Sequence, residues 1–218
     1  MKEKRSFSAW LQDYVMYIVV IVLIIIFAIA TRGTFLRPQN LINIVNQNVY
    51  LLIIGVGITF IMLSGAMDLS IGYQVSTIAV TMGLLAKYDV HWLLILFIGI
   101  VLGLLLGLIN GAIYAWLRVF PFIITLATQY CLHGATNLLS NAKTFRNFSD
   151  AFKILGSYSF KFTLGDMRIV FPIGILIMIL IIALGAFILN RTYFGRNIYA
   201  LGSNPDAVAL SGVSVAKM

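Results

Sequence analysis

Long runs of apolar residues, separated by short polar stretches, constrain the fold of this chain more than any other feature. A helix needs about 20 apolar residues to cross the hydrocarbon core of a bilayer. The run from Trp92 to Leu117 contains no charged residue and exceeds that length. Over the whole chain 61% of residues are hydrophobic and only 10% are charged, which is too few polar side chains to cover a water-soluble fold. The sequence therefore predicts an all-α, polytopic bundle of transmembrane helices surrounded by membrane lipid.

Six segments of the chain are predicted to span the membrane. They are residues 14–30, 49–63, 73–86, 92–117, 120–140 and 169–190. Residues 141–168 form a long polar connection, and residues 192–218 form a polar tail that contains glycine. A signal peptide would end in a cleavage motif of small residues followed by polar mature sequence. Neither follows the first apolar segment, so we predict that this segment is retained as a membrane anchor.

The second and third segments are both shorter than a membrane span requires. Between them lies Ser64-Gly65-Ala66-Met67-Asp68-Leu69-Ser70-Ile71-Gly72. Paired short segments around a polar, glycine-containing break are typical of discontinuous transporter helices. We predict such a helix near residues 64–72, with a simple turn at the membrane surface as the alternative.

Asp68 is the most unusual residue in this break. A carboxylate near hydrocarbon costs several kcal/mol unless it faces water or a partner, so such residues are usually functional. Alternatively, Asp68 or Ser70 caps the following helix by accepting hydrogen bonds from its first backbone N–H groups. The sequence leaves both roles open.

Four glycines repeat at every fourth position of the segment 92–117. Gly99, Gly103, Gly107 and Gly111 lie on one side of a helix, where the lack of side chains allows another helix to approach closely. Asn110, beside the last glycine, either lines a path through the protein or bonds a neighbouring helix, and we favour the helix contact.

Two polar stretches indicate further helix starts. Asn40, Asn43 and Asn46 recur every three residues after Pro38, which predicts either an interfacial helix that leads into the second span or a polar entrance to that span. Residues 204–206 are Asn-Pro-Asp. Asparagine is a favoured N-cap, proline is favoured at the first helical position, and an aspartate in the first turn interacts favourably with the positive end of the helix dipole. We therefore predict a short helix near residues 204–214.

Several function classes lack support in the sequence. The basic residues are scattered between the apolar runs, so no nucleic-acid stripe is expected. None of the 18 glycines is followed by lysine, which excludes a Walker A loop from this chain. The chain has one cysteine, Cys131, and two histidines, His91 and His133. These residues are too few and too scattered to predict a metal site, and no cofactor site is evident. Cys131 and His133 are two residues apart, on different helix faces, so no catalytic pair is predicted and the chain is not expected to be an enzyme.

Motifs along nearly the whole chain from Phe35 resemble the permease subunits of bacterial ABC importers for ribose, xylose and similar sugars. They are residues 40–43, 65–72, 110–111, 121–126 and 192–213. The last motif, with Phe194-Gly195-Arg196 and Asn204-Pro205, is the most specific. The same broad family includes branched-chain amino-acid permeases.

The resemblance implies an alternating-access pathway and a short cytoplasmic helix that couples it to a separate ATPase. The pathway residues it implies are Asp68, Ser70, Asn110, Phe122 and Thr125. The ATPase-coupling residues it implies are Tyr199, Gly202, Asn204, Ala207, Ser211, Gly212 and Val213.

The resemblance also implies an assembly in the bacterial cytoplasmic membrane, with the N-terminus of this chain in the cytoplasm. The expected partners are an ABC ATPase, an extracytoplasmic sugar-binding protein and a second permease copy. Family permeases continue with further spans, so we expect the C-terminal part of the family domain to be missing. A stand-alone secondary transporter, with Asp68 as a proton-coupled site, is the alternative function.

Overall fold

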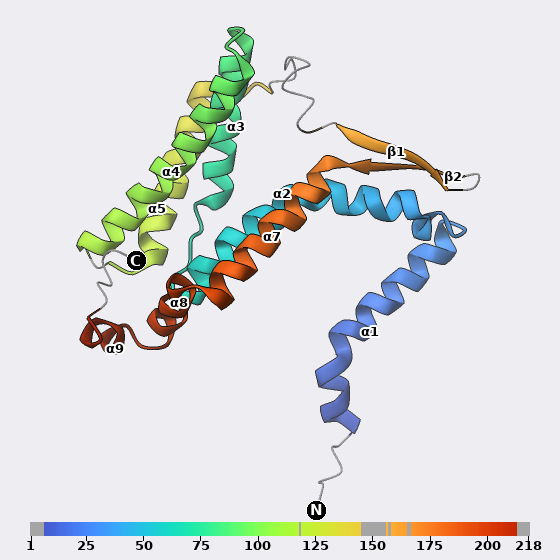
Figure 1. Ribbon diagram of the computed structural model, residues 1–218, viewed down its shortest axis with the longest axis horizontal. Coiled ribbons are helices and arrows are strands. Elements are labelled where there is room, and N and C mark those ends of the chain that lie inside the picture. The colour runs from blue at the N-terminus through green and yellow to red at the C-terminus, as the bar shows by residue number, and fades with distance from the viewer. Residues whose placement is uncertain (1–6, 118, 145–155, 157, 165–166, 213–218) are drawn as a thin grey trace, which may run out of the picture. The chain divides into compact units, whose positions relative to one another are not determined.

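A computed structural model describes residues 7–117, 119–144, 156, 158–164 and 167–212 (Figure 1). It confirms the predicted helical membrane bundle. The helices are α1 (Phe7–Ala30), the 3-10 turn η1 (Thr34–Leu36), α2 (Pro38–Leu63), α3 (Ile71–Lys87), α4 (Trp92–Leu117), α5 (Pro121–Ser140), α7 (Ile173–Arg191), α8 (Tyr193–Ser203) and α9 (Pro205–Leu210). Two paired strands, β1 (Ser159–Leu164) and β2 (Met167–Pro172), precede α7.

Three of the described helices are long and apolar enough to cross a membrane. They are α2 and α4, with 26 residues each, and α7, with 19 residues. Tyr14–Ala30, within α1, is a shorter apolar helix. The structure places α4 at the predicted bounds, while α3 and α5 remain predictions as membrane spans.

The second segment begins earlier than predicted. Residues 49–63 were expected to form a short helix of their own, but α2 is one continuous helix from Pro38. Two of the asparagines that suggested a separate element form hydrogen bonds with residues close by in the chain. Asn40 Nδ2 donates to the Phe35 carbonyl at 2.8 Å, and Asn43 Oδ1 accepts from Gln39 at 2.9 Å. Their side chains therefore stabilise the first turns of α2. The polar break, residues 64–70, separates α2 from α3. The depth of this break in the membrane remains a prediction.

The last predicted span begins four residues later than expected. Ile169 lies in β2, and α7 starts only at Ile173. An apolar run cannot by itself distinguish a strand from the first turn of a helix. The end of the predicted polar connection is therefore a β-hairpin.

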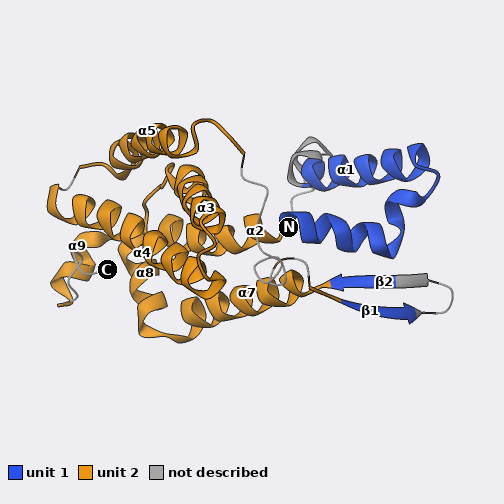
Figure 2. Ribbon diagram, turned by 90° about the horizontal axis from the view of Figure 1, so that it is seen from above, with its two compact units in different colours: residues 1–48, 160–171 blue, residues 49–159, 172–218 orange. Residues whose placement is uncertain are grey.

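The chain divides into two compact units, coloured separately in Figure 2. Unit 1 contains Met1–Asn48 and Phe160–Phe171. In it the Gln39 side chain pairs with the backbone of Val170: Gln39 Oε1 accepts from the N–H at 2.8 Å and Gln39 Nε2 donates to the carbonyl at 3.2 Å. This side chain thus attaches the first turn of α2 to strand β2.

Unit 2 contains Val49–Ser159 and Pro172–Met218. Within it α3 packs against both α4 and α5, and the Thr77 and Thr136 hydroxyls bond across α3 and α5 at 2.8 Å. A Cβ on Gly99 would lie 2.8 Å from the Met82 sulfur, so glycine allows α3 and α4 to come this close.

In unit 2, α7 also packs against α8, and each of the two helices approaches α2 closely at a glycine. A Cβ on Gly185 of α7 would lie 2.6 Å from a methyl group of Val56 on α2. The chain then turns sharply into α8, where Thr192 caps the helix by accepting from the Gly195 N–H at 3.2 Å. A Cβ on Gly195 would overlap the Leu189 carbonyl, so this turn requires a glycine.

Candidate functional site

Polar side chains from the break, α3, α4 and α5 form one hydrogen-bonded network in unit 2. The Ser70 hydroxyl donates to Asp68 Oδ1 at 2.6 Å, and it accepts from Asn110 Nδ2 at 2.9 Å and Gln74 Nε2 at 2.7 Å. Asn110 Oδ1 accepts from the Thr128 hydroxyl at 2.7 Å. Ser70 is fully buried and its single donor and two acceptor positions are all used. The predicted role of Asn110 as a bond between helices is confirmed.

The structure bears on the structural role of Asp68, while its role in transport remains a prediction. Its Oδ1 accepts from the Ser70 N–H at 2.7 Å, and Ser70 immediately precedes α3. Ser70 itself makes no capping bond with its side chain. The carboxylate of Asp68 therefore organises the start of α3, and the same residue also lines a cavity.

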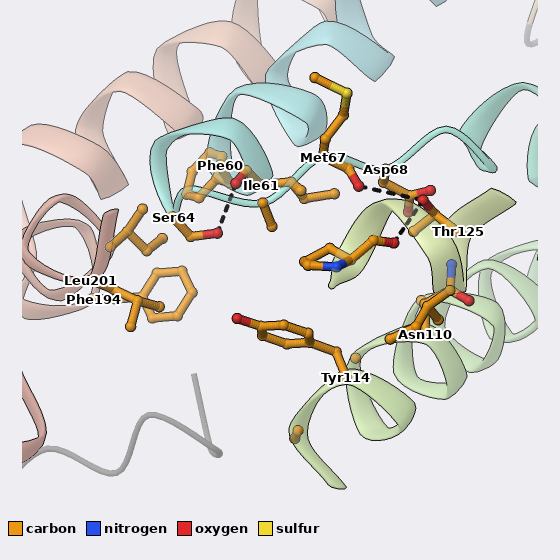
Figure 3. A pocket seen from close by; sticks show the side chains of 17 residues that line it. Phe60, Ile61, Ser64, Met67, Asp68, Asn110, Tyr114, Thr125, Phe194 and Leu201 are labelled. Atoms are coloured by element: carbon orange, nitrogen blue, oxygen red, sulfur yellow. Dashed lines mark hydrogen bonds between the residues drawn. The ribbon is translucent and has the colours of Figure 1, made fainter. Parts of the chain in front are cut away.

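This cavity lies within unit 2 and has a volume of about 290 Å³. Asp68, Asn110 and Thr125 supply polar side chains at one end of it, and Ser64 also lines it. Figure 3 shows the Tyr114 ring extending from α4 towards Phe194, with Asp68, Asn110 and Thr125 gathered at the other side of the space. The cavity therefore has an aromatic wall and a polar end.

The predicted pathway residues occupy three different environments. Asp68, Asn110 and Thr125 line the cavity, whereas Ser70 is buried behind them in the network. Phe122 is 41% exposed and is not among the described lining residues. The structure thus brings four of the five residues together.

The glycine ladder serves two purposes along α4. Gly99 and Gly103 face side chains of α3, as the predicted helix packing requires. At Gly107 and Gly111 a Cβ would meet no heavy atom within 4 Å, and both glycines line the cavity. The second half of the ladder therefore leaves space instead of bringing two helices together.

Tyr114 was not singled out by the sequence, although a signal for it exists. Gly107, Asn110, Gly111 and Tyr114 are spaced i, i+3, i+4 and i+7, which is one face of a helix. Phe60 and Phe194, which complete the aromatic wall, come from α2 and α8, and their rings are 6.3 Å apart. No local spacing connects these two residues, since they are far apart in the chain.

The predicted helix start in the tail is confirmed. Asn204 Oδ1 accepts from the Ala207 N–H at 3.0 Å, Pro205 is the first residue of α9, and Asp206 lies in its first turn. Among the predicted coupling residues, Tyr199, Gly202, Asn204, Ala207, Ser211 and Gly212 are exposed. Val213 lies outside the described residues.

The end of α8 lies directly against the end of α2. A Cβ on Gly202 would overlap the carbonyl oxygen of Leu63 and would lie 3.4 Å from the Gly65 nitrogen. Gly65 has a positive φ of 84°, a conformation that favours glycine. Because α8 also contributes Phe194, Ile198 and Leu201 to the cavity, the tail is in contact with both the break and the cavity wall.

Replacing Asn110 with leucine is expected to destabilise the protein by about 1–2 kcal/mol. The substitution removes two hydrogen bonds and leaves the Ser70 and Thr128 hydroxyls without these partners; interhelical bonds in membrane proteins contribute about 0.6 kcal/mol on average and up to about 1.7. The free energy of unfolding, measured by denaturant titration in detergent micelles, tests this. Asn48→Leu is the matched control, because exposed Asn48 bonds only the Ile44 carbonyl of its own helix. Equal losses in the two variants would contradict the network.

Comparison with known proteins identifies a family for this chain. Residues 40–218 match the family described as "Branched-chain amino acid transport system / permease component". This match includes the break, the cavity residues and both helices of the tail. No solved structure matches the chain significantly.

Curated relatives cover almost the entire chain. The galactose/methyl galactoside import permease of Salmonella typhimurium is 32% identical over 98% of this chain and 66% of its own length. The ribose import permease of Haemophilus influenzae is 33% identical over 91% of the chain and 61% of its own length. The fructose import permease of Rhizobium meliloti is 32% identical over 92% and 56%, respectively. The chain thus spans 56% to 66% of the length of these relatives.

Proposed function

Because this chain belongs to the branched-chain amino acid transport system permease family, we propose that it acts as a membrane-spanning permease subunit of an ATP-driven sugar importer. The observation that carries this proposal is the match over residues 40–218. The names of the relatives describe import permeases for galactose, ribose and fructose. A monosaccharide is therefore the proposed substrate, transported across the bacterial cytoplasmic membrane.

The proposed partners divide the work of transport. The proposed energy source is a separate ABC ATPase subunit, because no glycine in this chain is followed by lysine as a Walker A loop requires. An extracytoplasmic binding protein delivers the sugar, and a second permease copy completes the pathway. The helices α8 and α9 are the proposed contact with the ATPase.

The order of the helices supports one orientation. If α9 faces the ATPase in the cytoplasm, then α7, which is long enough to span the membrane, leads back to a hairpin outside. The cytoplasmic location of the N-terminus is proposed from the resemblance alone.

Uptake by reconstituted vesicles tests this function. Proteoliposomes that contain this chain, its ATPase and its binding protein are expected to accumulate radiolabelled sugar only when ATP is present on the ATPase side. The stand-alone alternative, in which Asp68 carries a coupled proton, predicts uptake driven by a pH gradient without ATPase or ATP. Uptake under the second condition alone would overturn the importer function.

A further inference from the structure

The cavity in unit 2 has a charge pattern that selects among small solutes. Asp68 is the only charged residue among the described residues that line it, and none of them is lysine, arginine or histidine. An anionic group such as a free carboxylate or a phosphate would find no basic side chain there, and it would be repelled by the Asp68 carboxylate. The cavity therefore disfavours a solute with an anionic group, such as the carboxylate of the amino acids that the family's description names.

The polar end of the cavity offers hydrogen bonds to hydroxyl groups. Asp68 Oδ2 has only a 3.4 Å contact with Gln74, so it can accept another bond. The second hydrogen of the Asn110 amide is not used in the described bonds to Ser70 and Thr128. A carboxylate that accepts and an amide that donates together can bind neighbouring hydroxyls on one molecule.

Tyr114 provides the complementary surface on the aromatic side. Its ring extends into the space in Figure 3, and the residue as a whole is 44% exposed. A tyrosine presents an apolar ring face together with one donor and acceptor. Phe60 and Phe194 extend the apolar wall, which matches the C–H face of a sugar ring.

The size of the cavity limits its occupant. Its volume of about 290 Å³ lies just below the usual range of ligand pockets, which is about 300 to 1,000 Å³. This volume accommodates a single sugar ring and is small for an oligosaccharide.

The geometry points to a transit site for a neutral monosaccharide, in which Tyr114 packs against the ring while Asp68 and Asn110 bind its hydroxyls. The sugar class rests on the proposed function, whereas the position of the site and the role of Tyr114 rest on the cavity. Tyr114 is thereby assigned as a residue that contacts the substrate during transport.

Saturation-transfer difference NMR on the full chain in lipid nanodiscs tests this site, because the method detects weak binding. D-ribose, D-galactose and D-fructose are the sugar probes, and L-leucine is the amino-acid probe. At least one sugar is expected to give a concentration-dependent signal, and L-leucine none. Tyr114→Ala is expected to weaken sugar binding about tenfold, since both a ring contact and a hydrogen bond are lost.

Two variants keep the test independent of folding defects. Tyr114→Phe retains the ring and is expected to bind with intermediate strength. Tyr88→Ala removes a tyrosine that is 74% exposed at the end of α3, away from the cavity lining, and is expected to bind as the unmodified chain does. Binding of L-leucine but no sugar would overturn the inference, as would equal sugar binding by Tyr114→Ala and Tyr88→Ala.

The same measurements separate this inference from the proposed importer function. Sugar signals that depend on Tyr114, combined with uptake that needs no ATP, would support the site and refute the importer. ATP-dependent uptake without any sugar signal that depends on Tyr114 would refute the site and leave the importer intact.

Discussion

Replacing Gly202 with alanine is expected to lower transport by the assembled importer at least tenfold while leaving the chain in the membrane. The added Cβ would overlap the Leu63 carbonyl, and backbone atoms cannot move aside as the end of a flexible side chain does. Forcing extra atoms into such a contact costs about 1–3 kcal/mol. The strain is relieved only if α8 moves away from the end of α2, and this separates the proposed ATPase contact from the break that holds Asp68.

Gly72→Ala provides the matched control for this experiment. Gly72 lies in the first turn of α3, and a Cβ there meets no heavy atom within 4 Å, so transport is expected to persist. Measurements of membrane content and of ATPase capture by affinity pull-down distinguish failed assembly from failed coupling. Gly202→Ala that assembles and transports normally would show that the contact between α8 and α2 does not carry motion.

Replacing Asp68 with asparagine is expected to reduce transport at least tenfold without reducing expression. The amide oxygen can still accept from the Ser70 N–H and hydroxyl, which now lie 2.7 and 2.6 Å from Asp68 Oδ1. The start of α3 therefore keeps its bonds, and the charge is the main loss. Carboxylates within membrane-embedded regions usually have a functional role.

Two further variants separate the charge of Asp68 from its structural bonds. Asp89→Asn removes an exposed acid, and asparagine tolerates the positive φ of 56° at that position, so transport is expected to remain. Ser70→Ala keeps the Asp68 charge but removes the hydroxyl shared by Asp68, Gln74 and Asn110, so stability is expected to fall. Normal sugar uptake by Asp68→Asn vesicles would remove the charge from the mechanism.

Local patterns in the sequence predicted the bounds of a helix well where those bounds depend on residues close by in the chain. The span 92–117 coincides with α4, because its apolar run is bounded by polar residues. The start of α9 at Pro205 was also predicted, since Asn204 caps a helix through an atom only three residues away. The second span was placed too late, because polar residues near Pro38 concealed the continuity of α2.

The candidate site was only partly visible in the sequence. Asp68, Asn110 and Thr125 were chosen individually, and the structure brings them together in the lining of one cavity. Tyr114 was missed because an aromatic residue in an apolar helix is ordinarily a lipid or packing contact. Its significance depends on Phe194, which belongs to a helix 80 positions further along the chain.

The sequence by itself determined that this chain is a helical membrane protein, where its main helix break lies, and to which family it belongs. These properties depend on hydrophobicity, caps and motifs that act over a few residues. Only the tertiary structure decided that Ser70 joins the break to α4, that Gly107 and Gly111 leave a cavity, and that Gly202 touches Leu63. Such contacts depend on how whole helices pack, and packing is set by the shapes of side chains that are distant in the chain.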